Sequence, residues 1–400
     1  MKRTMPGTGD EVSILGFGCM RFKRKLGSID LAKAEQQVAR ALAAGVNYFD
    51  TAYLYPGSEK ATGQLLNKAD ALGRRRDRVF LATKLPTMLV RSREDMDRML
   101  GVSLERLGTD HIDYYLMHNL NSLAGWQRLV DLGAADFIEK AQKSGRIRHI
   151  GFSWHGNLHE FRLVTDAYPW AFCQIQYNYL DEHFQAGTEG LRYAAAKGLG
   201  IIVMEPLRGG SLAHQVPPEA KKLFAAAREA GGHARSAAEW ALRWVWDHPE
   251  VGLALSGMNE TRQVEENVRV AADARAGTFS PEDDALIAAV RDVFRTAIKV
   301  DCTGCSYCMP CPYGVDIPTC FAYYNSFAAF GTLKPKFNYA FATRPSGGRP
   351  RRASACTGCG ACARKCPQHL PIPDLLPDVA KVLEGGVAGA FIKASRAFLR

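Results

Sequence analysis

Eight short apolar runs, separated by amphipathic helical stretches, follow one another between residues 12 and 270. Each run has the length and the β-branched or aromatic content of one buried strand. Several helical stretches end at a glycine, the residue preferred just after a helix C-terminus. The runs are VSILGFG, NYFDTA, VFLATKL, IDYYLMH, IRHIGFS, FCQIQYN, GIIVMEPL and VGLALSGM. This alternation predicts an α/β fold, a (β/α)8 TIM barrel, over residues 1–298.

An open, doubly wound sheet is the competing α/β architecture. Its nucleotide site requires a glycine fingerprint after the first strand. The segment GFGCMRF, residues 16–22, lacks the third glycine and does not lead directly into a helix. We therefore favour the closed barrel.

Eleven cysteines are the unusual part of the composition, and eight of them lie in two tight groups after residue 300. The first residues are basic, but the apolar segment of an export signal does not follow them. The sequence also contains no stretch of eighteen uninterrupted apolar residues, the length that would span a membrane. We expect a cytoplasmic protein in which the grouped cysteines are reduced metal ligands rather than disulfides.

The two cysteine groups have the spacing of iron–sulfur ligands. They are Cys302-x2-Cys305-x2-Cys308-x2-Cys311-Pro312 and Cys356-x2-Cys359-x2-Cys362-x3-Cys366-Pro367. The second group has the full spacing of the bacterial ferredoxin motif, in which three cysteines bind one [4Fe-4S] cluster and the fourth binds the other. By that logic Cys366 joins the triplet that begins at Cys302, and Cys311 joins the triplet that begins at Cys356.

Residues 299–400 are therefore predicted to form a small iron–sulfur domain with two [4Fe-4S] clusters. Zinc is the alternative, but zinc sites usually take two cysteines from each knuckle rather than four packed cysteines ending in Cys-Pro. The segment between the groups has helical apolar spacing, so this domain resembles an α-helical ferredoxin.

The basic charge of the chain belongs mostly to this tail. The formal net charge is +10, and residues 301–400 contain 12 Lys and Arg against 5 Asp and Glu. A nucleic-acid role is disfavoured because the basic residues do not form a known binding motif with stacking aromatics. Negatively charged clusters would offset part of the excess. The remainder suggests docking of an acidic electron carrier.

Three polar residues end consecutive apolar runs of the predicted barrel: Asp50, Lys84 and His118. Reacting groups of TIM barrels lie at the C-terminal ends of the strands, and the loop after Asp50 brings Tyr55 over the same end. A nearby cation lowers the pKa of a phenol, so Lys84 would make Tyr55 a usable proton donor. Asp50 would keep Lys84 charged, and His118 would orient a carbonyl oxygen. This set predicts carbonyl reduction by hydride and proton transfer.

The motifs FDTAYLYPGSE, LATKL, IDYYLMH, IRHIGFS and CQIQYN resemble those of the aldo-keto reductase superfamily over roughly residues 12–270. The resemblance implies that Asp50, Tyr55, Lys84 and His118 form a catalytic tetrad, with Tyr55 as the general acid. It also implies NADP(H) or NAD(H) bound without a Rossmann fold. The implied cofactor-binding residues are Gly18, Cys19, Met20, Ser153, Gln174, Met204, Leu207, Arg262, Glu266 and Asn267.

Within that set, the resemblance implies that Ser153 and Gln174 bind the carboxamide of the nicotinamide. It also implies that Glu266 and Asn267 contact the adenine. This chain departs from the family pattern at Trp154, where an asparagine is usual, and at Met204, where an aromatic residue often stacks on the nicotinamide. Arg262 lies one sequence position from the basic residue that usually binds the 2′-phosphate. This favours NADPH over NADH. Cys19, Met20, Tyr53 and Trp154 are expected to line the mouth and to favour an apolar carbonyl compound.

The leading functional prediction is an NAD(P)H-dependent aldo-keto reductase fused to a two-cluster domain, acting on a small carbonyl substrate. The alternative is an iron–sulfur electron-transfer or redox-sensing protein whose barrel binds nucleotide with little turnover. Hydride carries two electrons whereas each cluster accepts one, so the two halves cannot exchange electrons directly.

Overall fold

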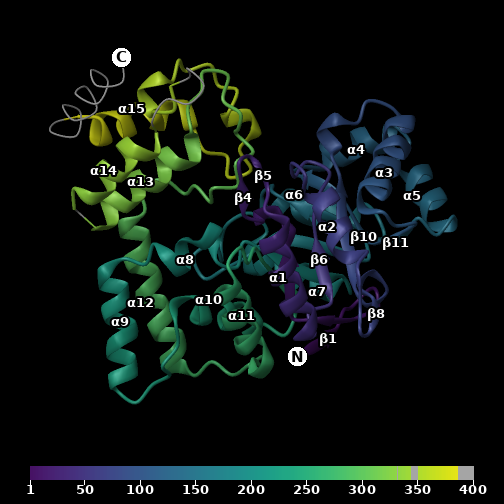
Figure 1. Ribbon diagram of the computed structural model, residues 1–400, viewed down its shortest axis with the longest axis horizontal. Helices are drawn as coiled ribbons and strands as arrows, with labels where there is room; N and C mark the ends of the chain where they lie inside the picture. The colour runs from purple at the N-terminus through teal and green to yellow at the C-terminus, as the bar shows by residue number, and fades with distance from the viewer. Residues whose placement is uncertain (331, 344–349, 386–400) are drawn as a thin grey trace. The chain divides into compact units, whose positions relative to one another are not determined.

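The computed structural model describes residues 1–330, 332–343 and 350–385 (Figure 1). The chain divides into two compact units. The first contains Met1–Leu207 and Ala238–Phe279, and the second contains Arg208–Ala237 and Ser280–Arg400.

The first unit is built on a closed barrel of eight parallel strands, in the order β10-β11-β12-β13-β14-β3-β6-β9. The strands are β3 (Leu15–Gly18), β6 (Tyr48–Asp50), β9 (Phe80–Leu85), β10 (Ile112–Leu120), β11 (Ile147–Trp154), β12 (Phe172–Gln176), β13 (Gly200–Met204) and β14 (Leu253–Ser256). Six of them fall within one of the eight apolar runs, and β10 and β11 extend beyond theirs by two residues and one residue. The predicted (β/α)8 barrel is therefore confirmed.

Helices surround the strands on the outside of this barrel (Figure 1). They are α1 (Leu31–Ala43), α2 (Ser58–Leu66), α3 (Arg93–Leu107), α4 (Leu123–Asp131), α5 (Ala134–Lys143), α6 (Leu158–Asp166), α7 (Gly187–Ala196), α10 (Ala237–Asp247) and α11 (Thr261–Asp273). Asp30, Ser92, Ser122 and Asn157 are side-chain N-caps that accept a backbone N–H at the start of α1, α3, α4 and α6. Such caps satisfy donors that a helix leaves unpaired at its first turn.

The N-terminal end of the barrel is closed by an antiparallel hairpin of β1 (Lys2–Thr4) and β2 (Glu11–Ser13). Met5 from this hairpin is fully buried, and a Cβ on Gly200 or Gly252 would lie 2.6 Å from its side chain. The two glycines therefore make room for the plug. Two further short hairpins, β4 (Arg24–Lys25) with β5 (Ser28–Ile29) and β7 (Ala69–Asp70) with β8 (Gly73–Arg74), lie in loops. Because the hairpin fills the N-terminal end of the barrel, a functional site is expected at the C-terminal end.

The second unit is helical. It contains α8 (Ser211–His214), α9 (Pro218–Glu229), α12 (Pro281–Ala297), α13 (Ile317–Phe330), α14 (Lys334–Ala342) and α15 (Ile372–Leu383). Val315, Ile317, Phe321, Ile372 and Leu376 form its buried core. Tyr339 links three of its segments, because its hydroxyl donates to Glu384 at 2.7 Å and accepts from the backbone N–H of Ala353 at 2.8 Å.

The division into units does not fall at the predicted boundary between residues 298 and 299. Helix α9, which follows β13 in the chain, packs against α12, so both helices belong to the second unit. A single boundary in the sequence cannot assign residues 208–237 to the second unit, because they come before the end of the barrel in the chain. The domain boundary between residues 298 and 299 stays a prediction. Among the described residues, none of the helices combines the length and apolarity needed to cross a bilayer.

Candidate functional sites

A buried ion pair lies at the C-terminal end of the barrel. Asp50 ends β6, and Lys84 lies next to the last residue of β9. The Nζ of Lys84 donates to both carboxylate oxygens of Asp50, at 2.6 and 2.7 Å, and to the carbonyl oxygen of Thr51 at 2.8 Å. Burial raises the pKa of Asp50 and lowers that of Lys84, and the attraction between the two charges opposes both shifts. Each charge therefore has its partner inside the protein.

Tyr55 and His118 lie beside this pair. The Nζ of Lys84 is 5.2 Å from the centroid of the Tyr55 ring, and the Tyr55 and His118 rings meet edge to face with centroids 5.9 Å apart. Burial lowers the pKa of His118 well below its ordinary value, and the charge of Lys84 adds to this shift. The imidazole is therefore neutral at neutral pH. The structure brings the four predicted residues together.

Residues outside the predicted set hold Lys84 and His118 in place. The hydroxyl of Thr87 donates to the carbonyl oxygen of His118 at 2.6 Å. Buried Glu59 accepts from Thr83, next to Lys84, at 2.7 Å and pairs with Arg106 at 3.0 Å. Thr51 could have been found because it directly follows Asp50. Glu59 carries no such signal, since its partner Arg106 is distant in the chain.

Ser153 and Gln174 are register partners on β11 and β12. The hydroxyl oxygen of Ser153 accepts the backbone N–H of Asn119 at 2.8 Å, which leaves its own hydrogen to donate. The amide nitrogen of Gln174 contacts the sulfur of Met204 at 3.5 Å. Its Oε1 is buried and has no hydrogen-bond partner in the described part of the chain. An unused acceptor beside a hydroxyl donor fits a primary carboxamide such as that of nicotinamide.

The other predicted cofactor residues of the barrel lie near its C-terminal end. Gly18 pairs in register with Asp50, and a Cβ there would lie 3.4 Å from the carbonyl oxygen of Ser256. Cys19 is fully buried, and burial raises its pKa to about 12, so this thiol is unreactive. Met20, Met204 and Leu207 are half-buried.

Trp154 does not line a substrate pocket, so that expectation is wrong. Its side chain is completely buried against Phe152 and Phe161, with ring centroids 6.1 and 5.5 Å away, and its Nε1 donates to the carbonyl oxygen of Gly156 at 2.8 Å. Side chains alternate between the two faces of a strand. Ser153 and Trp154 therefore face opposite ways, and Trp154 packs on α6.

Three predicted adenosine-binding residues lie on α11. Asn267 is buried and donates to the hydroxyl of Ser256 at 2.9 Å, Glu266 is half-buried and Arg262 is exposed. Lys23, at 2.5 Å, and Lys33 both pair with Glu260, the N-cap of this helix. These ion pairs hold the pKa of Glu260 at about 2. The two lysines precede the helix by more than 220 residues, so no motif in the sequence links them to it.

The cysteines of the second unit gather in two groups of four. One cavity is lined by Cys302, Cys305, Cys308 and Cys366, together called the Cys302 site. Burial raises the pKa of Cys308, and the neighbouring Cys302, Cys305 and Cys366 raise it further. Three of the four cysteines thus come from one motif and the fourth comes from the other.

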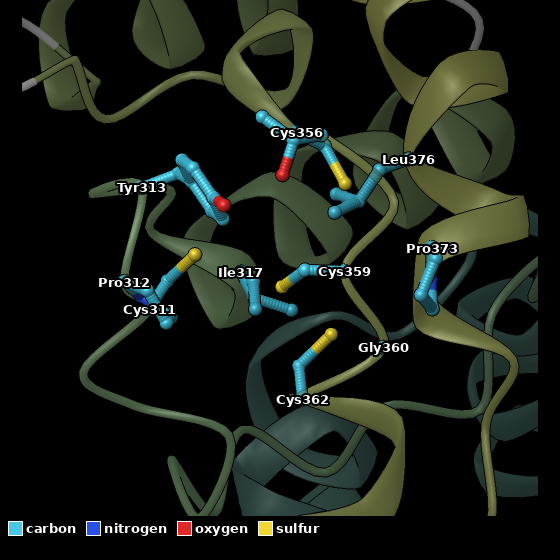
Figure 2. Close-up of a pocket in the computed structure, with 11 residues that line it drawn as sticks. Cys311, Pro312, Tyr313, Ile317, Cys356, Cys359, Gly360, Cys362, Pro373 and Leu376 are labelled. Atoms are coloured by element: carbon cyan, nitrogen blue, oxygen red, sulfur yellow. The ribbon is translucent and has the colours of Figure 1, made fainter.

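The second group has the reverse composition. A second cavity is lined by Cys311, Cys356, Cys359 and Cys362, together called the Cys356 site. Figure 2 shows the four sulfur atoms around a common space, with Ile317 and Leu376 on its wall. Each site has one buried cysteine, Cys308 or Cys362, and Cys359 of the Cys356 site is exposed.

The chemistry of these sites fits [4Fe-4S] clusters, which four cysteine thiolates hold. The backbone N–H of Gly304 points at the sulfur of Cys302 at 3.4 Å, and that of Gly358 points at Cys356 at the same distance. Such donors stabilise thiolates. In the described ranges, no three His, Cys, Asp or Glu side chains converge closely enough for a single metal ion.

The two cysteine motifs also repeat each other beyond their cysteines. Both begin Cys-Thr-Gly-Cys, and both continue through Cys-Pro to an Ile-Pro pair, Ile317-Pro318 and Ile372-Pro373. Each Ile-Pro pair opens a helix, α13 or α15. Cysteine spacing alone conceals this repeat, which a comparison of the two segments reveals.

Comparison with known proteins agrees with this arrangement. Residues 14–290 match the aldo/keto reductase family, and residues 301–370 match a 4Fe-4S dicluster domain. L-galactose dehydrogenase of Arabidopsis thaliana is 30% identical over 281 residues, which cover 66% of this chain and 86% of that enzyme. An aldo-keto reductase of Schizosaccharomyces pombe whose name includes NADP(+) is 26% identical over 215 residues, or 51% of this chain and 60% of that protein.

Solved structures agree with the barrel. A holo-form aldo-keto reductase from Bacillus halodurans has a TM-score of 0.58 and 26% identity, covering 72% of this chain and 95% of that one. An aldo/keto reductase from Klebsiella pneumoniae, solved with NADP and acetate, has the same TM-score at 23% identity over 73% of this chain and 96% of that one. This protein therefore belongs to the aldo/keto reductase family of oxidoreductases and carries a C-terminal 4Fe-4S dicluster domain.

Proposed function

We propose that the barrel reduces an aldehyde or ketone to the alcohol with NADPH or NADH, and that Tyr55 donates the proton. The observation that carries this proposal is the buried Asp50–Lys84 pair beside the Tyr55 ring. The reduced nicotinamide supplies a hydride to the carbonyl carbon. The Tyr55 hydroxyl gives its proton to the carbonyl oxygen, so the carbon–oxygen double bond becomes the C–H and O–H of the alcohol.

The residues around Tyr55 have separate tasks in this proposal. The ammonium of Lys84 stabilises the phenolate that remains after proton transfer. Asp50 keeps Lys84 charged and in place, because an unpaired ammonium would lose its proton at a site this buried. The neutral imidazole of His118 donates a hydrogen bond to the carbonyl oxygen and so fixes its direction.

The proposed cofactor residues act on the two ends of the nucleotide. Gln174 Oε1 accepts from the carboxamide of the nicotinamide, and the Ser153 hydroxyl donates to it. Gly18, Cys19, Met20, Met204 and Leu207 would line the same binding surface, and Arg262, Glu266 and Asn267 would hold the adenosine. The NADP that accompanies the Klebsiella relative and the name of the Schizosaccharomyces relative support NADPH.

The proposed function is tested by anaerobic turnover with a panel of aldehydes and ketones, followed as oxidation of NADPH and of NADH. We expect oxidation that depends on the carbonyl compound. If neither nucleotide is oxidised with any member of the panel, carbonyl reduction is refuted and the electron-transfer or sensing alternative is favoured.

Glu260→Gln is expected to raise the preference for NADPH over NADH. The substitution releases Lys23 and Lys33 from their carboxylate partner, so both lysines can face a 2′-phosphate held at α11. Because the charges are exposed, the ratio of the two kcat/KM values should change only about two- to fivefold. Glu265→Gln is the matched control, since Glu265 lies on α11 as well but pairs with Arg40 of α1. An equal change in both variants would contradict the assignment.

We also propose that the second unit holds two [4Fe-4S] clusters with crossed ligation, at the Cys302 site and the Cys356 site. The four cysteines around each cavity support this assignment. A single zinc ion would need its sulfur ligands about 2.3 Å from one centre, whereas a cluster accepts thiolates that are further apart. Each cluster exchanges one electron at a time, so a mediator is required if the clusters are to serve the barrel.

The exposed Cys359 and the basic tail support an acidic one-electron carrier as partner of the clusters. If opposite charges bring the two proteins together, salt screens the attraction. The rate of reduction by an acidic ferredoxin should then fall by about tenfold or more between low and high ionic strength. A rate that is independent of salt would exclude electrostatic docking.

A further inference from the structure

Arg208 is a buried cation beside the Cys302 site. Its side chain is only 6% exposed, and its Nη2 donates to Asp301 Oδ1 at 2.8 Å. Asp301 directly precedes Cys302, and Arg208 and Cys302 both line a further cavity, distinct from the four-cysteine cavity. A positive charge thus lies next to the first cysteine of this site.

The backbone holds Arg208 in this position at some cost. Its φ is +47°, in the left-handed region that side chains other than glycine rarely adopt, and Gly209 and Gly210 continue with φ of +67° and +92°. The hydroxyl of Ser211 donates to the carbonyl oxygen of Arg208 at 2.8 Å and fixes the turn. The arginine is therefore directed into the unit by a constrained turn.

The Cys356 site differs from the Cys302 site in this respect. The two sites share four cysteines and a glycine N–H at 3.4 Å. Where Asp301 precedes Cys302, Ala355 precedes Cys356. Arg364 and Lys365, which lie between Cys362 and Cys366 in the chain, are exposed, so water and salt weaken their influence. The two sites thus differ in the charges next to their first cysteine. The Cys302 site has the buried Arg208 with its largely exposed partner Asp301, whereas the buried Arg352, four residues before Cys356, does not line the Cys356 cavity.

Charge and burial near an iron–sulfur cluster set its reduction potential. Reduction adds one negative charge, which burial disfavours and a nearby buried cation favours. Burial alone would make the Cys302 cluster the harder of the two to reduce. We propose that Arg208 makes the Cys302 cluster the easier of the two clusters to reduce. An electron that a low-potential one-electron donor gives to the second unit would then rest on the Cys302 cluster. This inference depends on the two-cluster assignment of the proposed function.

Arg208→Gln in the full-length, iron-loaded protein tests the proposal by redox titration followed by EPR. The reduction constant of the Cys302 cluster should fall at least about tenfold, which is a shift of about 59 mV for one electron. The Cys356 cluster serves as an internal control and should keep its potential. Cys305→Ser and Cys359→Ser assign the two signals, because each removes a ligand from one site only. An unchanged Cys302 cluster, or an equal shift of both clusters, overturns the proposal.

Two further variants separate charge from folding. Arg208→Lys keeps the charge and should keep most of the potential. Asp301→Asn removes the negative partner of Arg208 and should raise the potential of the Cys302 cluster. If Arg208→Gln loses iron, Asp301→Asn decides, and a potential that does not rise overturns the inference. A wild-type chain that binds no iron would instead refute the two-cluster assignment.

Discussion

Tyr55→Phe is expected to lower kcat for carbonyl reduction by at least about 100-fold while nucleotide affinity stays nearly unchanged. The substitution removes only the hydroxyl that donates the proton, and a positioned general acid contributes about 100- to 10,000-fold. The phenyl ring keeps its contacts with Lys84 and His118. Turnover with the best carbonyl substrate measures the first effect, and a fluorescence titration with NADPH measures the second.

Tyr53→Phe is the matched control for this prediction. Tyr53 lies two residues away in the same loop, and its ring faces the guanidinium of Arg106, with the carbon centre 4.5 Å from the ring centroid. Loss of its hydroxyl should leave kcat within about twofold. If Tyr55→Phe retains more than about a tenth of wild-type kcat, another group donates the proton.

Cys366→Ser is expected to disrupt the cluster at the Cys302 site although Cys366 lies in the motif of the other site. The cavity that Cys366 lines is shared with Cys302, Cys305 and Cys308. The substitution leaves the four thiolates of the Cys356 site intact. Iron content should therefore fall from about eight towards about four atoms per chain, and reduced-state EPR should match that of Cys305→Ser.

Three comparisons make this result specific. Cys311→Ser should resemble Cys359→Ser, because both remove ligands of the Cys356 site. Cys320→Ala should keep both clusters, since Cys320 lies by Tyr339 and lines neither four-cysteine cavity. If the EPR spectrum of Cys366→Ser instead follows that of Cys359→Ser, ligation is local and the crossed assignment is wrong.

The barrel could be predicted because its strands are buried on both faces, which makes each one a continuous apolar run. Asp50, Lys84 and His118 were visible for the same reason, as the polar residues that interrupt such runs. The position of Trp154 could not be read in this way. An apolar side chain gives no sign of the face on which it lies, and only the alternation from Ser153 assigns it to the helices.

Long-range partners were also hidden from the sequence. Lys23 and Lys33 reach Glu260 only because the barrel closes β14 against β3. Arg208 reaches Asp301 because the segment after β13 packs with α12 in the second unit. Such pairs depend on tertiary packing between segments that are far apart in the chain, which neither periodicity nor motif spacing reports.

The crossed cysteine groups have a consequence for how the protein acquires its metal. The span from Cys311 to Cys356 lies inside the span from Cys302 to Cys366, so loading the outer site already gathers the ligands of the inner one. Closing a free loop of this length costs about 3 kcal/mol, and the second cluster to be inserted avoids most of that cost. Cluster insertion should therefore be cooperative. With limiting iron and sulfide, native mass spectrometry should find empty and fully loaded chains together, and a dominant half-loaded species would show that the two sites fill independently.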